Sequence, residues 1–171
     1  MPTLPRRRLL KLALGGVGVA AGGLGGLFAL RGAAPEVSGL AVLSPHEYRT
    51  MAALAEAMFP GGAVGGESLD LARAFDGYLA DEAEWARDEA KQALTLLELG
   101  PVIFERRLTT FSNLAPAERI AHFTRWGVSD NGLRRQVAVG FRKFLCLVFY
   151  DQPVAWAGIG YDGPMLPEAT P

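Results

Sequence analysis

Apolar and polar positions follow a helical period along most of the chain after residue 35. In the first such stretch the apolar residues fall three or four positions apart, which predicts an amphipathic helix. These residues are Tyr48, Met51, Leu54, Ala55 and Met58. Ser44-Pro45-His46-Glu47 has the order of a capping box with proline at the first helical position, so we expect the helix to begin there. Phe59-Pro60-Gly61 is expected to end it.

The same criterion predicts five further helices. The second is capped by Ser68 and has its inner face at Leu71, Phe75, Tyr78 and Leu79; the third covers residues 81–99; the fourth covers 102–111; the fifth carries Ile120 and Phe123; and the sixth carries Leu133, Val137, Phe141, Phe144, Leu145 and Val148. No β-pattern is found. The expected fold class is therefore all-α: a single small helical domain of about six helices after an N-terminal signal or anchor helix, with an irregular Pro/Gly/aromatic C-terminal tail.

The end of the sixth helix and the tail after it are unusual in their apolar residues. From Phe144 to Tyr150 the helix is apolar nearly all round, which indicates burial either in its own domain or against a partner. After Asp151 apolar residues stand among glycines without any period, so this tail must lie on its own domain or on another subunit. Its candidate partner-binding residues are Pro153, Trp156, Ile159, Tyr161 and Pro164.

The first 34 residues have the order of an export signal. Arg6-Arg7-Arg8 is a basic start, Leu12 to Leu30 is a glycine-rich apolar run without charge, and Gly32-Ala33-Ala34 supplies small residues beyond it. We therefore divide the chain into a leader at 1–34 and a helical domain at 35–171.

The leader also resembles the twin-arginine signal, which is a polar residue, two arginines, any residue, an apolar pair and often lysine. Arg6, Arg7, Leu9, Leu10 and Lys11 fill these positions, with Pro5 in place of the usual Ser or Thr. The resemblance implies that the twin-arginine translocase exports a folded cargo to the periplasm or to the periplasmic face of the bacterial inner membrane. An ordinary N-terminal membrane helix is the alternative. Because Arg31 sits beside the small-residue exit, both cleavage and retention as a membrane anchor stay open.

Charge and composition argue against several classes of function for this chain. The leader holds five of the 17 Lys and Arg residues and none of the 18 Asp and Glu residues, so the remainder has a net charge of −6. This argues against binding of nucleic acid. The only cysteine, Cys146, is expected to be a buried inert thiol. We find no catalytic, cofactor-binding or metal-binding constellation, since the two histidines, His46 and His122, are far apart.

Four cations on the sixth helix form a basic edge, Arg134-Arg135 and Arg142-Lys143. A solvated helix face is the simpler interpretation, and a partner-binding patch is the alternative.

Three pieces of the chain together resemble a known family. They are the twin-arginine leader; Leu43-Ser44-Pro45-His46-Glu47-Tyr48 with Leu54-Ala55-Glu56-Ala57-Met58-Phe59-Pro60-Gly61; and Phe149-Tyr150-Asp151-Gln152-Pro153 with Trp156 and Ile159-Gly160-Tyr161-Asp162-Gly163-Pro164. In this order they resemble the gluconate 2-dehydrogenase subunit 3 family, the small subunit of membrane-bound sugar and alcohol dehydrogenases.

The resemblance implies a non-catalytic helical subunit that binds no cofactor itself. It implies a large FAD-dependent partner of the glucose–methanol–choline type, often alongside a multihaem cytochrome c subunit, and export of the folded, FAD-loaded pair by the leader of the small subunit. The alternative from another class is a stand-alone exported helical protein that binds a ligand or the envelope.

Overall fold

The computed structural model describes residues 30–34, 36–60 and 69–163, and within these residues the chain forms helices and no strand. The expected all-α class is confirmed for this part of the chain. In chain order the elements, with η for a 3-10 helix, are α3 (Pro45–Met58), α4 (Leu71–Asp81), α5 (Glu84–Glu98), α6 (Gly100–Glu105), η1 (Phe111–Asn113), α7 (Pro116–Gly127), α8 (Gly132–Tyr150), α9 (Pro153–Trp156) and η2 (Ala157–Ile159). The expected signal helix lies outside the described residues.

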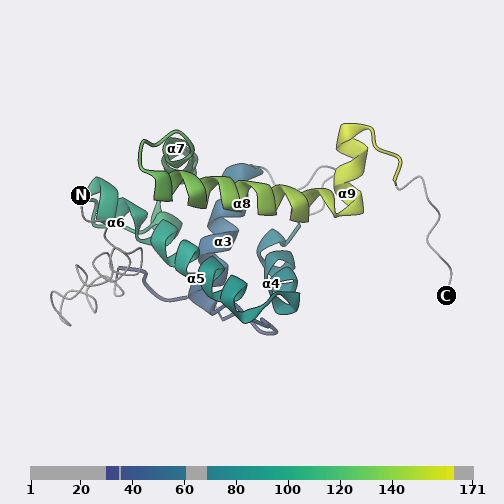
Figure 1. The fold of residues 1–171 in the computed structure, drawn as a ribbon, viewed down its shortest axis with the longest axis horizontal. Coiled ribbons are helices and arrows are strands. Elements are labelled where there is room, and N and C mark those ends of the chain that lie inside the picture. The colour runs from purple at the N-terminus through teal and green to yellow at the C-terminus, as the bar shows by residue number, and fades with distance from the viewer. Residues whose placement is uncertain (1–29, 35, 61–68, 164–171) are drawn as a thin grey trace, which may run out of the picture.

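Helix α3 is the central element, and it contacts α4, α5, α7 and η1 (Figure 1). Its start confirms the predicted capping box: the backbone N–H of Ser44 donates to the Glu47 carboxylate at 2.7 Å, and the Ser44 hydroxyl accepts from the Glu47 N–H at 3.4 Å. Met51 and Leu54 on its apolar stripe are fully buried. The pattern of the sequence therefore identified both the start and the inner face of this helix.

Helix α8 runs along the molecule and packs on α7 and α4 (Figure 1). Asn131 caps it by accepting hydrogen bonds from the N–H groups of Leu133 and Arg134. From α4, the ring of Phe75 meets Phe141 and Phe144 edge-on, at centroid distances of 6.3 and 4.9 Å. One side of α8 is thus fixed on the core by aromatic contacts.

The predicted cap of the second helix and the predicted end of the fourth helix are wrong. Helix α4 is capped by Asp70, whose carboxylate accepts from the Arg73 N–H at 2.9 Å, whereas the expected cap Ser68 lies outside the described residues. The fourth helix, predicted over 102–111, ends at Glu105. Arg106 adopts a left-handed conformation with φ 53°, which reverses the chain, and a separate turn then carries the fully buried Phe111 into the core.

The tail is more regular than predicted, because α9 and η2 form short helical turns after α8. Pro153 begins α9, where a proline is favoured since its missing N–H would have no helical partner. Ala155 is buried, so the tail rests in part on its own domain.

Candidate interaction surface

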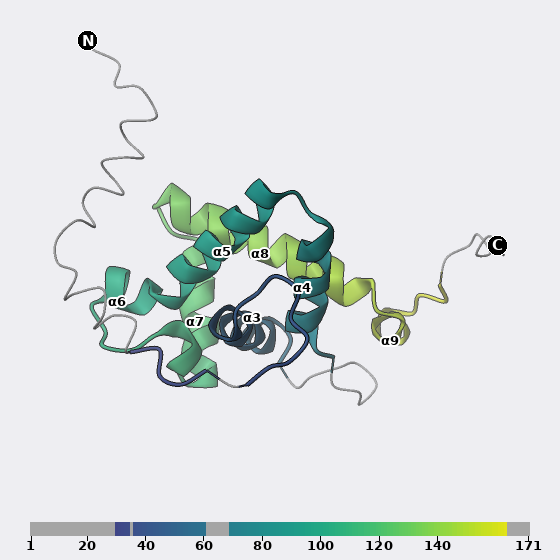
Figure 2. The ribbon, with the colours of Figure 1, turned by 90° about the horizontal axis from the view of Figure 1, so that it is seen from below.

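The predicted export residues Arg6, Arg7, Leu9, Leu10 and Lys11 lie outside the described residues. The chain after them is described from residue 30, and we call residues 30–34 and 36–43 the strap. The strap passes around the N-terminal end of α3 (Figure 2). Residues 30–34 of the strap are the end of the predicted leader, and residues 36–43 continue to the start of α3. The attachment of the strap therefore matters for any function of the leader.

Two side chains hold the first part of the strap. Arg49 on α3 donates to the backbone oxygens of Arg31 at 2.8 Å and Ala33 at 3.0 Å. Asn113 in η1 donates to the backbone oxygen of Leu30 at 3.0 Å and accepts a hydrogen bond from Arg49. The small-residue exit at Gly32-Ala33-Ala34 is therefore tied to the folded body.

A buried carboxylate holds the second part of the strap. Asp76 on α4 accepts hydrogen bonds from three successive N–H groups, of Ala41 at 2.6 Å, Val42 at 2.9 Å and Leu43 at 2.7 Å, and is only 2% exposed. Burial by itself raises the pKa of Asp76, but the three N–H donors together with Arg73 outweigh it and hold the pKa below its ordinary value. This carboxylate is therefore a structural anchor for the strap.

The predicted partner-binding residues of the tail form a small aromatic fold-back. Trp156 and Tyr161 meet edge-on at 5.4 Å, and the Trp156 indole N–H donates to the backbone oxygen of Tyr150 at 2.8 Å. Ile159 is 57% exposed and Tyr161 44% exposed, and Pro153 is exposed as well. The structure thus brings Trp156 and Tyr161 together and leaves the side chain of Ile159 exposed. Pro164 lies outside the described residues.

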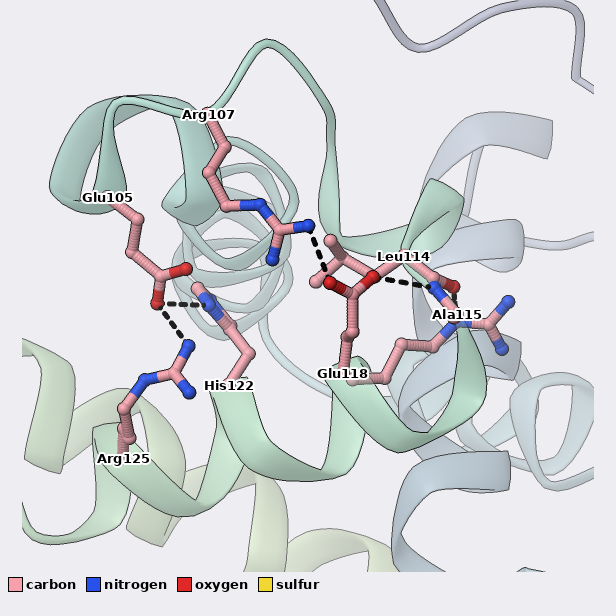
Figure 3. Close-up of polar contacts among 8 residues, drawn as sticks. Glu105, Arg107, Leu114, Ala115, Glu118, His122 and Arg125 are labelled. Carbon is pink, nitrogen blue, oxygen red and sulfur yellow. Dashed lines mark hydrogen bonds and ion pairs between the residues drawn. The ribbon is translucent and has the colours of Figure 1, made fainter.

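His122 is the one described titratable group that combines full burial with a carboxylate partner and a shifted pKa (Figure 3). Its Nδ1 lies 2.8 Å from Oε1 of Glu105, and the same oxygen accepts from Arg125 at 2.7 Å. Burial lowers the pKa of His122, and the Glu105 carboxylate, which acts in the opposite direction, offsets only part of this effect. Burial raises the pKa of Glu105, but its contacts with Arg125 and His122 bring it below the ordinary value. The lowered pKa of His122 favours the neutral imidazole, and the lowered pKa of Glu105 favours the carboxylate that faces Nδ1.

The environment of this histidine is a packed interior. Its Nε2 is buried without a hydrogen-bond partner, and a Cβ placed on Gly100 would lie 2.8 Å from it. The ring also lies 5.7 Å from that of Phe111 and 5.4 Å from that of Trp126. This pair therefore joins α6 to α7.

The loop between α6 and α7 is held by side chains at the start of α7 (Figure 3). Glu118 accepts from Arg107 at 2.7 Å and from the backbone N–H of Ala115 at 3.3 Å, which closes the loop onto the first turn of α7. Arg119 donates to the backbone oxygen of Leu114 at 2.9 Å. These contacts replace the helix that the sequence predicted at 106–111.

Glu98 is a second buried carboxylate, 3% exposed at the end of α5. It accepts from the N–H and the hydroxyl of Ser112 at 3.0 and 2.7 Å and from the Thr50 hydroxyl at 3.2 Å. These contacts are all with neighbouring elements of the fold, so Glu98 joins α5, η1 and α3.

Sequence reasoning missed Asp76 and Glu98, although a signal for both was present. Asp76 falls in the apolar stripe with Ala72, Phe75 and Leu79, and Glu98 directly follows Leu97 of the buried face of α5. A carboxylate in an apolar register needs partners to be buried, but the sequence did not show that they would be backbone N–H groups from the strap and hydroxyls from η1 and α3.

Cys146 departs from its expected full burial. It is partly exposed and lines a shallow cavity of about 250 Å³ with Met58, Phe123 and Arg142. A second cavity, of about 190 Å³, lies between α3 and α4. Among the described residues no three His, Cys, Asp or Glu side chains gather as a metal site would require.

Within the described ranges, no helix has the length and apolar character needed to cross a membrane. Comparison of the whole chain with family models, with curated proteins and with solved structures finds no match in any of the three.

Proposed function

We propose that this chain is the non-catalytic small subunit of a periplasmic or membrane-associated FAD-dependent dehydrogenase of the glucose–methanol–choline type. In this role it serves the assembly of the catalytic subunit and carries it through the twin-arginine pathway. FAD, and haem c where a cytochrome subunit is present, belong to the partners.

The observation that carries the proposal is the ordered set of three resembling pieces, two of which meet in space. Phe59 stands near the end of the second piece and Phe149 opens the third, and their rings stack with centroids 4.3 Å apart. The contact places the ends of the two pieces in one part of the core. Their meeting supports the interpretation that they belong to one shared architecture.

The strap offers further support. An exported flavoprotein binds FAD before translocation, which requires a route for folded proteins and a signal on one member of the folded pair. Here Arg49 and Asn113 hold the end of the predicted leader, and Asp76 holds the chain that follows it, on the helical body. Such an attachment suits a leader that transports a folded body together with what is bound to it.

The alternative, a stand-alone exported protein that binds a small ligand, receives less support. Ligand pockets usually enclose about 300–1,000 Å³, whereas the cavity between α3 and α4 and the cavity beside Cys146 have volumes of about 190 and 250 Å³. Both are shallow grooves between helices.

The test is export of the partner in the native host. The full-length chain is purified from the membrane and periplasmic fractions, and the associated protein is identified by mass spectrometry and by its flavin absorption. The double variant Arg6→Lys/Arg7→Lys is expected to leave both the chain and the flavoprotein in the cytoplasm. The matched variant Arg8→Lys, which leaves the arginine pair intact, is expected to export both. Normal export of the flavoprotein in the double variant, or a wild-type chain without any flavoprotein, contradicts the proposal.

A further inference from the structure

Helix α8 presents an uncovered face on the side away from its core contacts. Val139, Lys143, Leu147 and Tyr150 follow one another at spacings of four, four and three residues, which places them on one side of the helix. Val139 is 43%, Leu147 58% and Tyr150 45% exposed. We call these four residues the α8 face. The sequence predicted that the apolar end of this helix is covered by its own domain or by a partner, and the described part of its own domain leaves the α8 face open.

The charged residues of helix α8, which carries the α8 face, are all cations. Helix α8 holds four cations and no carboxylate, although the chain beyond the leader is acidic overall. Within the described part of the chain none of these cations forms an ion pair with an acidic group. Arg134 lies over the ring of Phe104 and Arg142 over that of Phe123, at 4.9 and 6.0 Å, and Arg135 donates to the backbone oxygen of Ser129. The exposed Lys143 is left available for a partner's carboxylate.

The tail extends this uncovered surface. Trp156 is tied to the last turn of α8 through the backbone oxygen of Tyr150, and Ile159 and Tyr161 follow with about half of their surface exposed. Apolar side chains with a basic rim form a surface that is typical of protein contacts, in which aromatic residues and arginine are enriched.

The α8 face lies away from the strap. The strap surrounds the N-terminal end of α3, whereas α8 crosses near the C-terminal end, where Phe59 stacks on Phe149 (Figures 1 and 2). Fourteen helical residues separate the two ends, or about 20 Å at 1.5 Å per residue. The predicted leader joins the helical body through the strap, so the α8 face and this junction lie toward opposite ends of α3.

We propose that the α8 face, with Ile159 and Tyr161 of the tail, docks an apolar patch rimmed by Asp and Glu on the catalytic flavoprotein; this inference rests on the proposed function. Leu147 and Tyr150 supply the desolvated centre of the contact. Lys143 pairs with a carboxylate of the rim, which favours association and fixes the orientation. The proposed partner surface is therefore larger than the one expected from the sequence. The tail by itself offers apolar residues but no cation.

The experiment measures the affinity between the purified flavoprotein and full-length variants of this chain. Lys143→Glu/Leu147→Asp changes one cation and one apolar residue that both point outward, and it is expected to weaken binding by about tenfold or more. Lys91→Glu/Leu108→Asp makes the same chemical changes on other elements, and Leu108 is 86% exposed; this control is expected to bind like the wild type. Thermal unfolding of both variants verifies that they fold.

The possible outcomes separate the two proposals. Unchanged flavoprotein binding by a folded Lys143→Glu/Leu147→Asp variant overturns the docking surface but leaves the proposed function intact. Failure of the wild type to bind any flavoprotein overturns both. A variant that loses binding to phosphatidylglycerol-containing vesicles while it retains the flavoprotein identifies a lipid-binding face and also overturns the docking proposal.

Discussion

Phe59 and Phe149 stack face to face, with ring centroids 4.3 Å apart and planes 11° from parallel. Phe59 follows the end of α3, and Phe149 is 5% exposed near the end of α8. The stack thus connects the C-terminal ends of the two helices that carry the strap and the α8 face.

This stack predicts a measurable coupling. Phe149→Ala is expected to lower the free energy of unfolding by about 3 kcal/mol, because it removes a buried ring. In a double-mutant cycle with Phe59→Ala, we expect a coupling of about 1 kcal/mol from the ring contact. Urea unfolding of the four proteins measures it. A cycle with Leu108→Ala and Phe149→Ala serves as the control, and the two changes in the free energy of unfolding should add. An equal coupling in this control would show that the effect is not specific to the stack.

Gly100 predicts a steric effect on stability. A Cβ at this position would lie 2.6 Å from Cζ2 of Trp126 and 2.8 Å from Nε2 of His122, both in the packed interior. Gly100→Ala should therefore cost about 1–3 kcal/mol. The matched substitution is Gly77→Ala in α4, where a Cβ meets nothing within 4 Å, and it should stabilise by up to about 1 kcal/mol. Urea midpoints of the two variants should move in opposite directions, and a stabilised Gly100→Ala would contradict the packing.

His122 predicts loss of stability on mild acidification. Its pKa is lower in the folded chain than its ordinary value, so the unfolded chain binds more protons, and stability falls as the pH drops through the ordinary histidine range. We expect the urea midpoint to decrease between about pH 7.5 and pH 5.5. His122→Gln should flatten this dependence, while His46→Gln, which removes the other histidine, should preserve it. A slope unchanged by His122→Gln would assign it to another group.

We predict that the attachment of the strap depends on the charged carboxylate of Asp76. Its pKa is held below the ordinary value, so its contribution to stability is complete above the ordinary carboxyl pKa and is lost as the pH falls through the lowered one. Asp76→Asn should cost about 1–3 kcal/mol, because the amide offers a single acceptor oxygen without charge to three N–H donors.

Hydrogen exchange is the direct measurement for the strap. The amides of Ala41, Val42 and Leu43 should exchange faster in Asp76→Asn than in the wild type. Asp81→Asn at the exposed end of the same helix is the control, and it should leave these amides protected. Protection that persists in Asp76→Asn would show that other contacts hold the strap.

The helical class and most of the helix positions could be read from the chain because they depend on local pattern. The Ser44–Glu47 capping box and the apolar spacing of α3 involve residues within one or two turns of each other, so their physics is contained in a short window. The same holds for the inner face of α8. The expectation failed at residues 106–111, where Arg106 in a left-handed conformation and the contacts of Glu118 override local propensity.

The sequence by itself determined the helical body, the charge asymmetry and the order of the leader, because these are properties of composition and local period. Only the tertiary structure decided which side chains are buried and which polar groups have hydrogen-bond partners. It placed the strap over Asp76, joined Glu98 to Ser112 and Thr50, and left Leu147 and Tyr150 in solvent. The physical reason is that burial and hydrogen-bond satisfaction depend on groups far apart in the chain, which a local pattern cannot specify.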